Sequence, residues 1–192
     1  MKKKILFMVI ALMTAMAGWA QETENVRIDN GGKRTLNGYK AFYEVEYGFD
    51  IDNYEDYYKG DREGGYPHCT NLMLSTSQGY QINNYIYAGG GIGLLRYLDA
   101  KETVMPLFLD VRVNFLNDKK VMPFITGRIG GVVGVWGGLY GSIWLGARLK
   151  TSSKHAVLFS VGASEHLAEV FVPVDHSGWQ ALSLGLKLGY EF

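Results

Sequence analysis

The chain has 192 residues, enough for one domain, and its 19 basic and 19 acidic residues cancel, which gives no electrostatic basis for binding nucleic acid. Its single cysteine, Cys69, excludes an internal disulfide framework, and with it the class of small disulfide-stapled extracellular modules. The high contents of Gly (25) and Tyr (13) disfavour helix and favour strand.

Residues 1–20 have the layout of a secretory signal peptide. Three lysines precede an apolar run over residues 5–17, and the small residues Gly18 and Ala20 follow. The run is shorter than the ~20 residues that span a membrane, so we predict cleavage between Ala20 and Gln21 rather than an uncleaved membrane anchor. Residues 21–37 are polar and are predicted to form a periplasmic N-terminal segment.

The rest of the chain, residues 38–192, alternates between apolar and polar side chains. In residues 39–49, Val45 and Tyr47 fall on one face while Glu44 and Glu46 fall on the other. Such period-2 alternation is typical of strands with one buried face. Eight segments show it or an apolar run of strand length: residues 39–49, 69–82, 84–98, 104–116, 121–135, 139–150, 155–164 and 181–192.

The segments between these strands differ in length. Short turns are predicted at residues 83–84, 117–120 and 151–154, and long loops at residues 50–68 and 165–178. The uncharged stretch 129–147 is long enough for a membrane-spanning helix, but it contains seven glycines, each costing ~1 kcal/mol in a helix interior. Two strands are therefore predicted there. The stretch "GGGIG" (residues 89–93) is also interpreted as strand, since no βαβ unit follows it.

An exported, two-faced antiparallel sheet hides its edges most simply by closing into a barrel. Alternation alone leaves open which face points outward. Three features favour a membrane barrel with its leucines outside: a polar face rich in Gly, Ala and Ser, strands of ~9–11 residues, and aromatic residues near strand ends. These aromatic residues are Tyr39, Tyr80, Tyr85, Tyr97, Phe115, Trp136, Trp179, Tyr190 and Phe192.

The closing strand, which ends in Tyr190-Glu191-Phe192, resembles the terminal strand of Gram-negative outer-membrane β-barrels. The stretches "GYKAFYEVEYGF", "GYQINNYIYAGGGIGL" and "PLFLDVRVNF" look like strands of the small porin-like, OmpA/OmpX-type barrels. The resemblance implies an all-β, antiparallel up-and-down transmembrane barrel of about eight strands in the outer membrane. It also implies that Tyr190 and Phe192 belong to a signal read by the barrel-insertion machinery. We expect a monomer surrounded by outer-membrane lipid, with both termini periplasmic and the longer loops outside the cell.

With the leucines outside, the lumen receives a set of charged residues: Glu44, Glu46, Asp110, Arg112, Arg128, Arg148 and Lys187. We expect Asp110, Arg112 and Arg128 to cluster on one side of the lumen, and Glu44, Glu46 and Lys187 on the other. An eight-stranded barrel is just wide enough to be filled by side chains. The sequence therefore predicts a lumen filled by salt bridges, with a gated ion path as the alternative. For the protein, it predicts a structural, surface-interaction or small-solute role.

No catalytic, metal or cofactor site is predicted. His68, His166 and His176 fall in predicted long loops, and no His or Cys pair has metal-ligand spacing. Glu165-His166 and Asp175-His176-Ser177 could imitate the site of a lipid-modifying barrel enzyme, which needs a base, an acid and a nucleophile at the membrane rim. Such an enzyme is one alternative function, and a secreted soluble barrel that binds a ligand inside is another.

Overall fold

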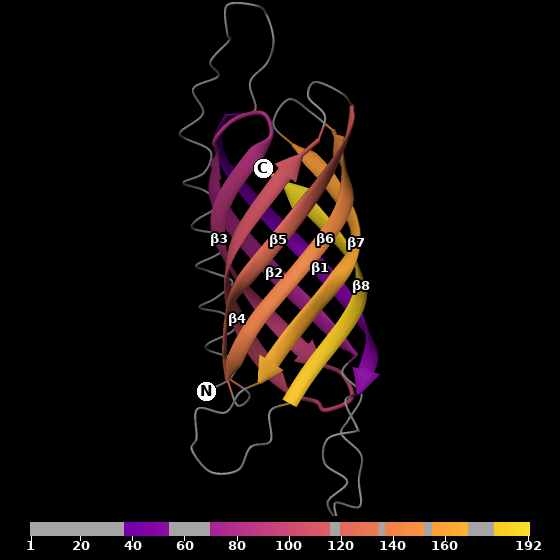
Figure 1. Cartoon of the computed structure of the whole chain (residues 1–192). Helices are drawn as coiled ribbons and strands as arrows, with labels where there is room; N and C mark the ends of the chain where they lie inside the picture. Colours follow the sequence, from indigo (N-terminus) through magenta and orange to yellow (C-terminus); the bar gives the residue numbers. More distant parts are fainter. Residues whose placement is uncertain (1–36, 54–69, 116–119, 135–136, 152–154, 169–178) are drawn as a thin grey trace, which may run out of the picture.

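A computed structural model describes residues 37–53, 70–115, 120–134, 137–151, 155–168 and 179–192, which form a closed antiparallel barrel. Each strand pairs with the next in sequence, and β8 pairs with β1 (Figure 1). No helix in these ranges is long and apolar enough to cross a membrane. The closed antiparallel pairing of the strands confirms the predicted all-β up-and-down barrel of eight strands. The strands are β1 (Gly38–Asn53), β2 (Asn71–Gln81), β3 (Ile86–Tyr97), β4 (Thr103–Asn114), β5 (Val121–Val133), β6 (Gly138–Lys150), β7 (Ala156–Ala168) and β8 (Trp179–Glu191).

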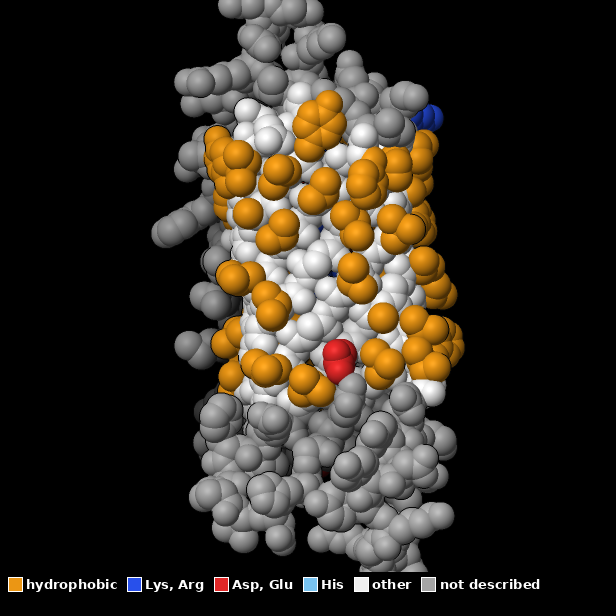
Figure 2. Space-filling view, viewed as in Figure 1, with side chains coloured by type: hydrophobic (Ala, Val, Ile, Leu, Met, Phe, Trp, Pro, Cys, Tyr) orange, Lys and Arg blue, Asp and Glu red, His pale blue; other side chains and the backbone are white. Residues whose placement is uncertain are grey.

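The wall of the barrel has opposite polarity on its two faces. On β4, Leu107, Leu109 and Val111 are exposed, whereas Asp110 and Arg112 between and beside them are buried. The same alternation runs along β8. In Figure 2, hydrophobic side chains are spread over the whole height of the visible wall, with backbone and other side chains between them. The predicted direction of the faces is correct: the leucines point outward and the charges point into the lumen.

The two ends of the barrel differ. Strands β2, β4, β6 and β8 stop at the end of the barrel where β1 starts, which we call the short-turn end; the opposite end is the loop end (Figure 1). In the first turn, the Asn83 Oδ1 atom accepts hydrogen bonds from the backbone N–H groups of Tyr85 and Ile86, both at 2.8 Å. This local side-chain bond explains why the chain reverses at the predicted asparagines.

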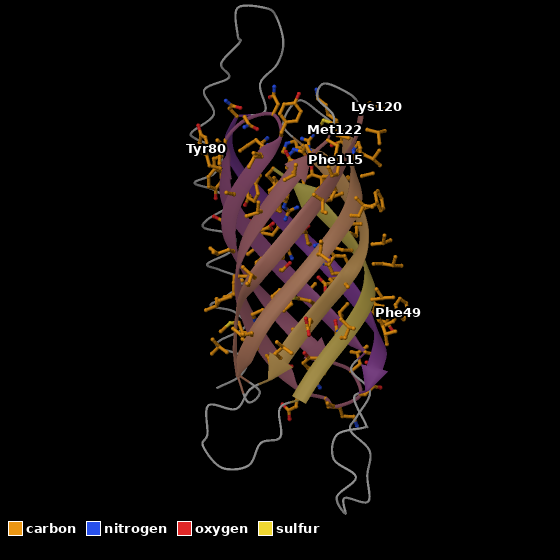
Figure 3. All side chains as sticks on the ribbon, in the orientation of Figure 1. Phe49, Tyr80, Phe115, Lys120 and Met122 are labelled. Atoms are coloured by element: carbon orange, nitrogen blue, oxygen red, sulfur yellow. The ribbon has the colours of Figure 1, made fainter. Side chains whose placement is uncertain are left out.

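Aromatic side chains occupy both faces near the strand ends. Tyr80 and Phe115 are exposed close to the short-turn end, and Phe49 is exposed towards the loop end (Figure 3). Tyr97 departs from this pattern, because it faces the lumen and is buried. Its hydroxyl lies 2.6 Å from the Nδ1 atom of His166. The prediction of Tyr97 as a membrane-interface residue was therefore wrong.

Strand β7 is longer than predicted. The predicted loop 165–178 begins inside β7, which continues to Ala168 and pairs with both neighbouring strands. His166 is thus a buried lumen residue rather than a loop residue. The polar pair Glu165-His166 resembled a loop in the sequence, but the hydrogen bond with Tyr97 stabilises His166 inside the barrel. Likewise β1 extends to Asn53, into the predicted 50–68 loop.

Inward-facing glycines make room for large lumen side chains and for close strand contacts. A Cβ atom at Gly162 would lie 2.2 Å from the backbone oxygen of Ile143 and 2.8 Å from the Trp144 ring. At Gly127, on the outward face of β5, a Cβ atom would meet nothing within 4 Å. Glycine is therefore required at the first position but not at the second.

We expect Gly162→Ala to lower the free energy of unfolding by ~1–3 kcal/mol, because the added methyl group would force the β6 backbone and Trp144 to move. Gly127→Ala is the matched control and should be close to neutral. Urea titration of the two variants refolded in the same lipid vesicles measures the difference. Equal losses of stability in both variants would contradict the close contact at Gly162.

Candidate functional site: the charged interior of the barrel

The middle of the lumen holds a buried network of two carboxylates and two guanidinium groups. Arg112 binds Glu44 in a bidentate manner, through Nη1 at 3.1 Å and Nη2 at 3.0 Å. The Arg112 Nη2 atom also lies 2.6 Å from Asp110 Oδ2, and Arg128 Nη2 lies 3.1 Å from the same oxygen. Arg128 also pairs with Glu44. Charge-assisted bonds of this kind are the strong ones in protein interiors.

The network spans the barrel rather than one wall. Asp110 on β4 is the Cα partner of Arg128 on β5, as adjacent strands require. Glu44 lies on β1, which pairs with neither β4 nor β5, so its contacts with Arg112 and Arg128 cross the lumen. The prediction placed Glu44 with Lys187 on the opposite side. This part of the prediction was wrong. Glu44 forms ion pairs with Arg112 and Arg128, because their long side chains reach across a narrow interior.

Aromatic rings flank the two arginines. The Cζ atom of Arg112 lies 3.7 Å from the centroid of the Phe42 ring, and that of Arg128 lies 4.5 Å from the centroid of Phe108. Cation–π contact is strongest when the cation has lost its water. The rings therefore stabilise the guanidinium groups and fill the lumen beside them.

A second ion-paired group lies near the short-turn end. The Arg148 Nε and Nη2 atoms bind the Glu191 carboxylate at 2.5 and 2.8 Å, and Lys40 Nζ binds it at 3.2 Å. Arg148 was predicted as a lumen charge, but Glu191 and Lys40 were not. Alternation places both residues on the polar face. Because each lies close to the end of its strand, the sequence did not indicate that its side chain would be buried.

Glu46 and Lys187 lie on the side of the lumen that the sequence predicted, as Cα partners on β1 and β8. Both are buried, and the Lys187 Nζ atom makes no hydrogen bond to the described residues. The Lys187 Nζ atom lies 4.3 Å from the centroid of the Trp144 ring. These two residues therefore neighbour the central network without a direct ion pair between them.

Apolar layers lie on either side of the central network. Towards the loop end, a cluster of inward side chains includes Leu95, Phe108 and Tyr140. Towards the short-turn end, a second cluster forms from Phe42, Tyr87, Phe124 and Leu158. Together with the ion pairs, these side chains fill the interior along most of its length.

The C-terminal residue is part of an aromatic cluster at the seam where β8 meets β1. The Phe192 ring lies 4.6 Å from Tyr190, 5.4 Å from Tyr43 and 5.5 Å from His155, measured between centroids. Its backbone N–H donates to the carbonyl of Ala41 at 3.0 Å. Phe192 therefore has three aromatic neighbours, although its side chain is 42% exposed.

Phe192→Ser should lower the amount of assembled barrel in cells, because Phe192 occupies the predicted position of the assembly signal. The ring contacts add a second effect: barrels refolded in vitro should lose ~1–3 kcal/mol of unfolding free energy. Phe115→Ser, which removes another exposed ring at the same end, is the control. Wild-type levels of the Phe192 variant in the outer membrane would contradict the assembly role.

The residues predicted as imitating an enzyme site do not come together in the described part of the chain. His166 lies inside the lumen against Tyr97, while His68 and the Asp175-His176-Ser177 stretch fall outside the described residues. Among the described residues, no group of three or more His, Cys, Asp or Glu side chains could hold a metal ion. The interior that is described is thus a network of ion pairs and rings.

No protein-family model matches the chain, and no curated protein matches it. Solved structures do. Neisserial surface protein A is 11% identical, with 80% of this chain and 95% of that chain covered and a TM-score of 0.54. The outer membrane protein AlkL is 13% identical (88% and 96% covered, TM-score 0.42), and Outer Membrane Protein W of E. coli is 10% identical (81% and 98% covered, TM-score 0.37). The chain has the fold of the small eight-stranded outer-membrane barrels.

Proposed function

We propose that this barrel is an integral outer-membrane protein whose lumen is closed to solutes and whose role is structural or in surface interaction. It inserts as a monomer with the help of the barrel-insertion machinery. The short-turn end, with both strand termini, faces the periplasm, and the loop end faces outward. The observation that carries this proposal is the cross-lumen network of Glu44, Asp110, Arg112 and Arg128.

The polarity of the wall supports a membrane location. Among the residues that the structure describes, nine charged side chains are buried inside, five cationic and four anionic, while large hydrophobic side chains dominate the exposed face. A soluble ligand-binding barrel has the reverse arrangement, since its outer face meets water. Membrane barrels, in contrast, place an apolar band against lipid and polar side chains in the lumen.

The chemistry of the network supports a closed lumen. An ion that crossed the barrel would have to separate Glu44 from both arginines, leaving buried charges without partners. The apolar layers above and below the network occupy part of the lumen and narrow the polar part that a hydrated ion could follow. Both features oppose the gated ion path. The alternative of a lipid-modifying enzyme loses support as well, because His166 faces the lumen rather than the lipid.

Purified, refolded protein should show no steady large conductance in planar lipid bilayers, because the ion pairs and rings fill the lumen. An open porin inserted in the same bilayers serves as the positive control. A shift in gel migration on heating should establish that the sample is folded. Stable, large and reproducible channels from the wild type would overturn the closed-lumen proposal and favour a pore.

A further inference from the structure

Three buried or partly buried cations and one carboxylate side chain lie near the short-turn end of the lumen. Glu191 is paired with Lys40 and Arg148, as described above. Lys150 follows Arg148 by two residues on β6 and therefore lies on the same face of the strand. Its Cα partner on β7, Ala156, is fully buried. Among the described side chains, one negative charge thus faces three positive charges.

Arg148 has donors to spare. A guanidinium group carries five N–H donors in a fixed fork. Glu191 takes the edge formed by Nε and Nη2, whereas Nη1 makes no hydrogen bond to the described residues although Arg148 is only 5% exposed. A buried charged donor without a partner is unfavourable. The second edge of Arg148 is therefore suited to another oxyanion.

The surroundings define from which side such an anion could enter. Phe42 is the Cα partner of Glu191, and Leu158 and Met122 are the Cα partners of Arg148. Phe42 and Leu158 belong to the buried apolar cluster next to the central network, so they separate this group of charges from the middle of the lumen. Met122 is buried at the short-turn end itself (Figure 3). Lys150 is only partly buried and lies at the last position of β6, towards the short-turn end. Access is thus from the water at that end, and the strand backbones separate the group from lipid.

We propose that the short-turn end of the lumen binds a small water-borne oxyanion, a phosphate or carboxylate group, through Arg148 Nη1 and Lys150. Glu191 orients Arg148 and holds Lys40, and it also competes with the bound anion. This site goes beyond the proposed closed-barrel function, which does not require any ligand. A barrel that fails to bind anions could still be closed, so the two proposals fail separately.

The test is titration of the full, refolded chain with inorganic phosphate in neutral detergent micelles, followed by isothermal calorimetry. Wild-type protein should bind phosphate in a saturable manner. Lys150→Gln should weaken binding by roughly tenfold, the size expected for one lost charge-assisted hydrogen bond. Lys101→Gln is the control, because Lys101 is exposed between β3 and β4 at the loop end, away from this site, and its loss should leave the affinity unchanged.

Glu191→Gln separates a binding role from a structural one. Loss of the competing carboxylate should tighten phosphate binding, whereas a purely structural ion pair would give unchanged or weaker binding. The absence of saturable phosphate binding in the wild type would overturn the proposal. Equal losses of affinity in Lys150→Gln and Lys101→Gln would overturn it as well. Doping the micelles with phosphatidylglycerol should not change the affinity for phosphate; competition by this lipid would place the site at the membrane face and contradict a lumen site.

Discussion

Arg128→Ala should lower the free energy of unfolding of the barrel by about 3–5 kcal/mol, which is the cost of removing one partner from a buried ion pair. Arg128 contacts both Glu44 and Asp110, and all three side chains are buried. After the substitution, two carboxylates share the single guanidinium group of Arg112. Urea unfolding of the variant in lipid vesicles, followed by gel migration, measures the loss. Arg96→Ala, which removes an exposed arginine at the end of β3, is the control.

A second substitution tests whether charge balance is the cause. The network of Glu44, Asp110, Arg112 and Arg128 has two charges of each sign, so Glu44→Gln in the Arg128→Ala background restores its neutrality. The double variant should be more stable than Arg128→Ala alone, which makes the two effects non-additive. Additive losses, or an Arg128→Ala effect no larger than that of Arg96→Ala, would show that the network does not stabilise the barrel.

The strands and their faces could be predicted from the sequence because a strand has a side-chain period of two. On β4, the alternation of Leu107, Leu109 and Val111 with Asp110 and Arg112 assigns each residue to a face without any knowledge of its neighbours. The pairing of Asp110 with Arg128 followed as well, since adjacent strands with a short turn have a nearly fixed register. The face and the neighbouring strand are both local properties of the chain.

Contacts across the lumen could not be predicted in this way. Whether Glu44 meets Arg112 or Lys187 depends on the stagger of the strands around the barrel and on how far each side chain reaches. The alternation of side chains along a strand contains no information about the stagger or about the reach of a side chain. Polar side chains at strand ends present the same difficulty: His166 resembled a loop residue until its partner Tyr97, 69 positions away in the chain, was known.

Membrane insertion itself can be tested at a single outward position in the middle of a strand. Leu109 is 64% exposed, and its Cα partners are Gly90 on β3 and Ile129 on β5, so it lies on the apolar wall midway along β4. In lipid, Leu109→Arg should lower the free energy of unfolding by ~2–4 kcal/mol, the cost of an arginine on the lipid face near the bilayer midplane.

Val121→Arg provides the matched control at the rim. Val121 is also outward and 47% exposed, but it is the first residue of β5, where an arginine can reach the headgroups and should cost only ~0–1 kcal/mol. Both variants are refolded into vesicles of the same lipid and unfolded with urea. A large loss at Leu109 with a small one at Val121 follows from the depth of each residue in the bilayer. Negligible losses at both positions would mean that water contacts the leucine face, and a soluble ligand-binding barrel would then be the better explanation of this fold.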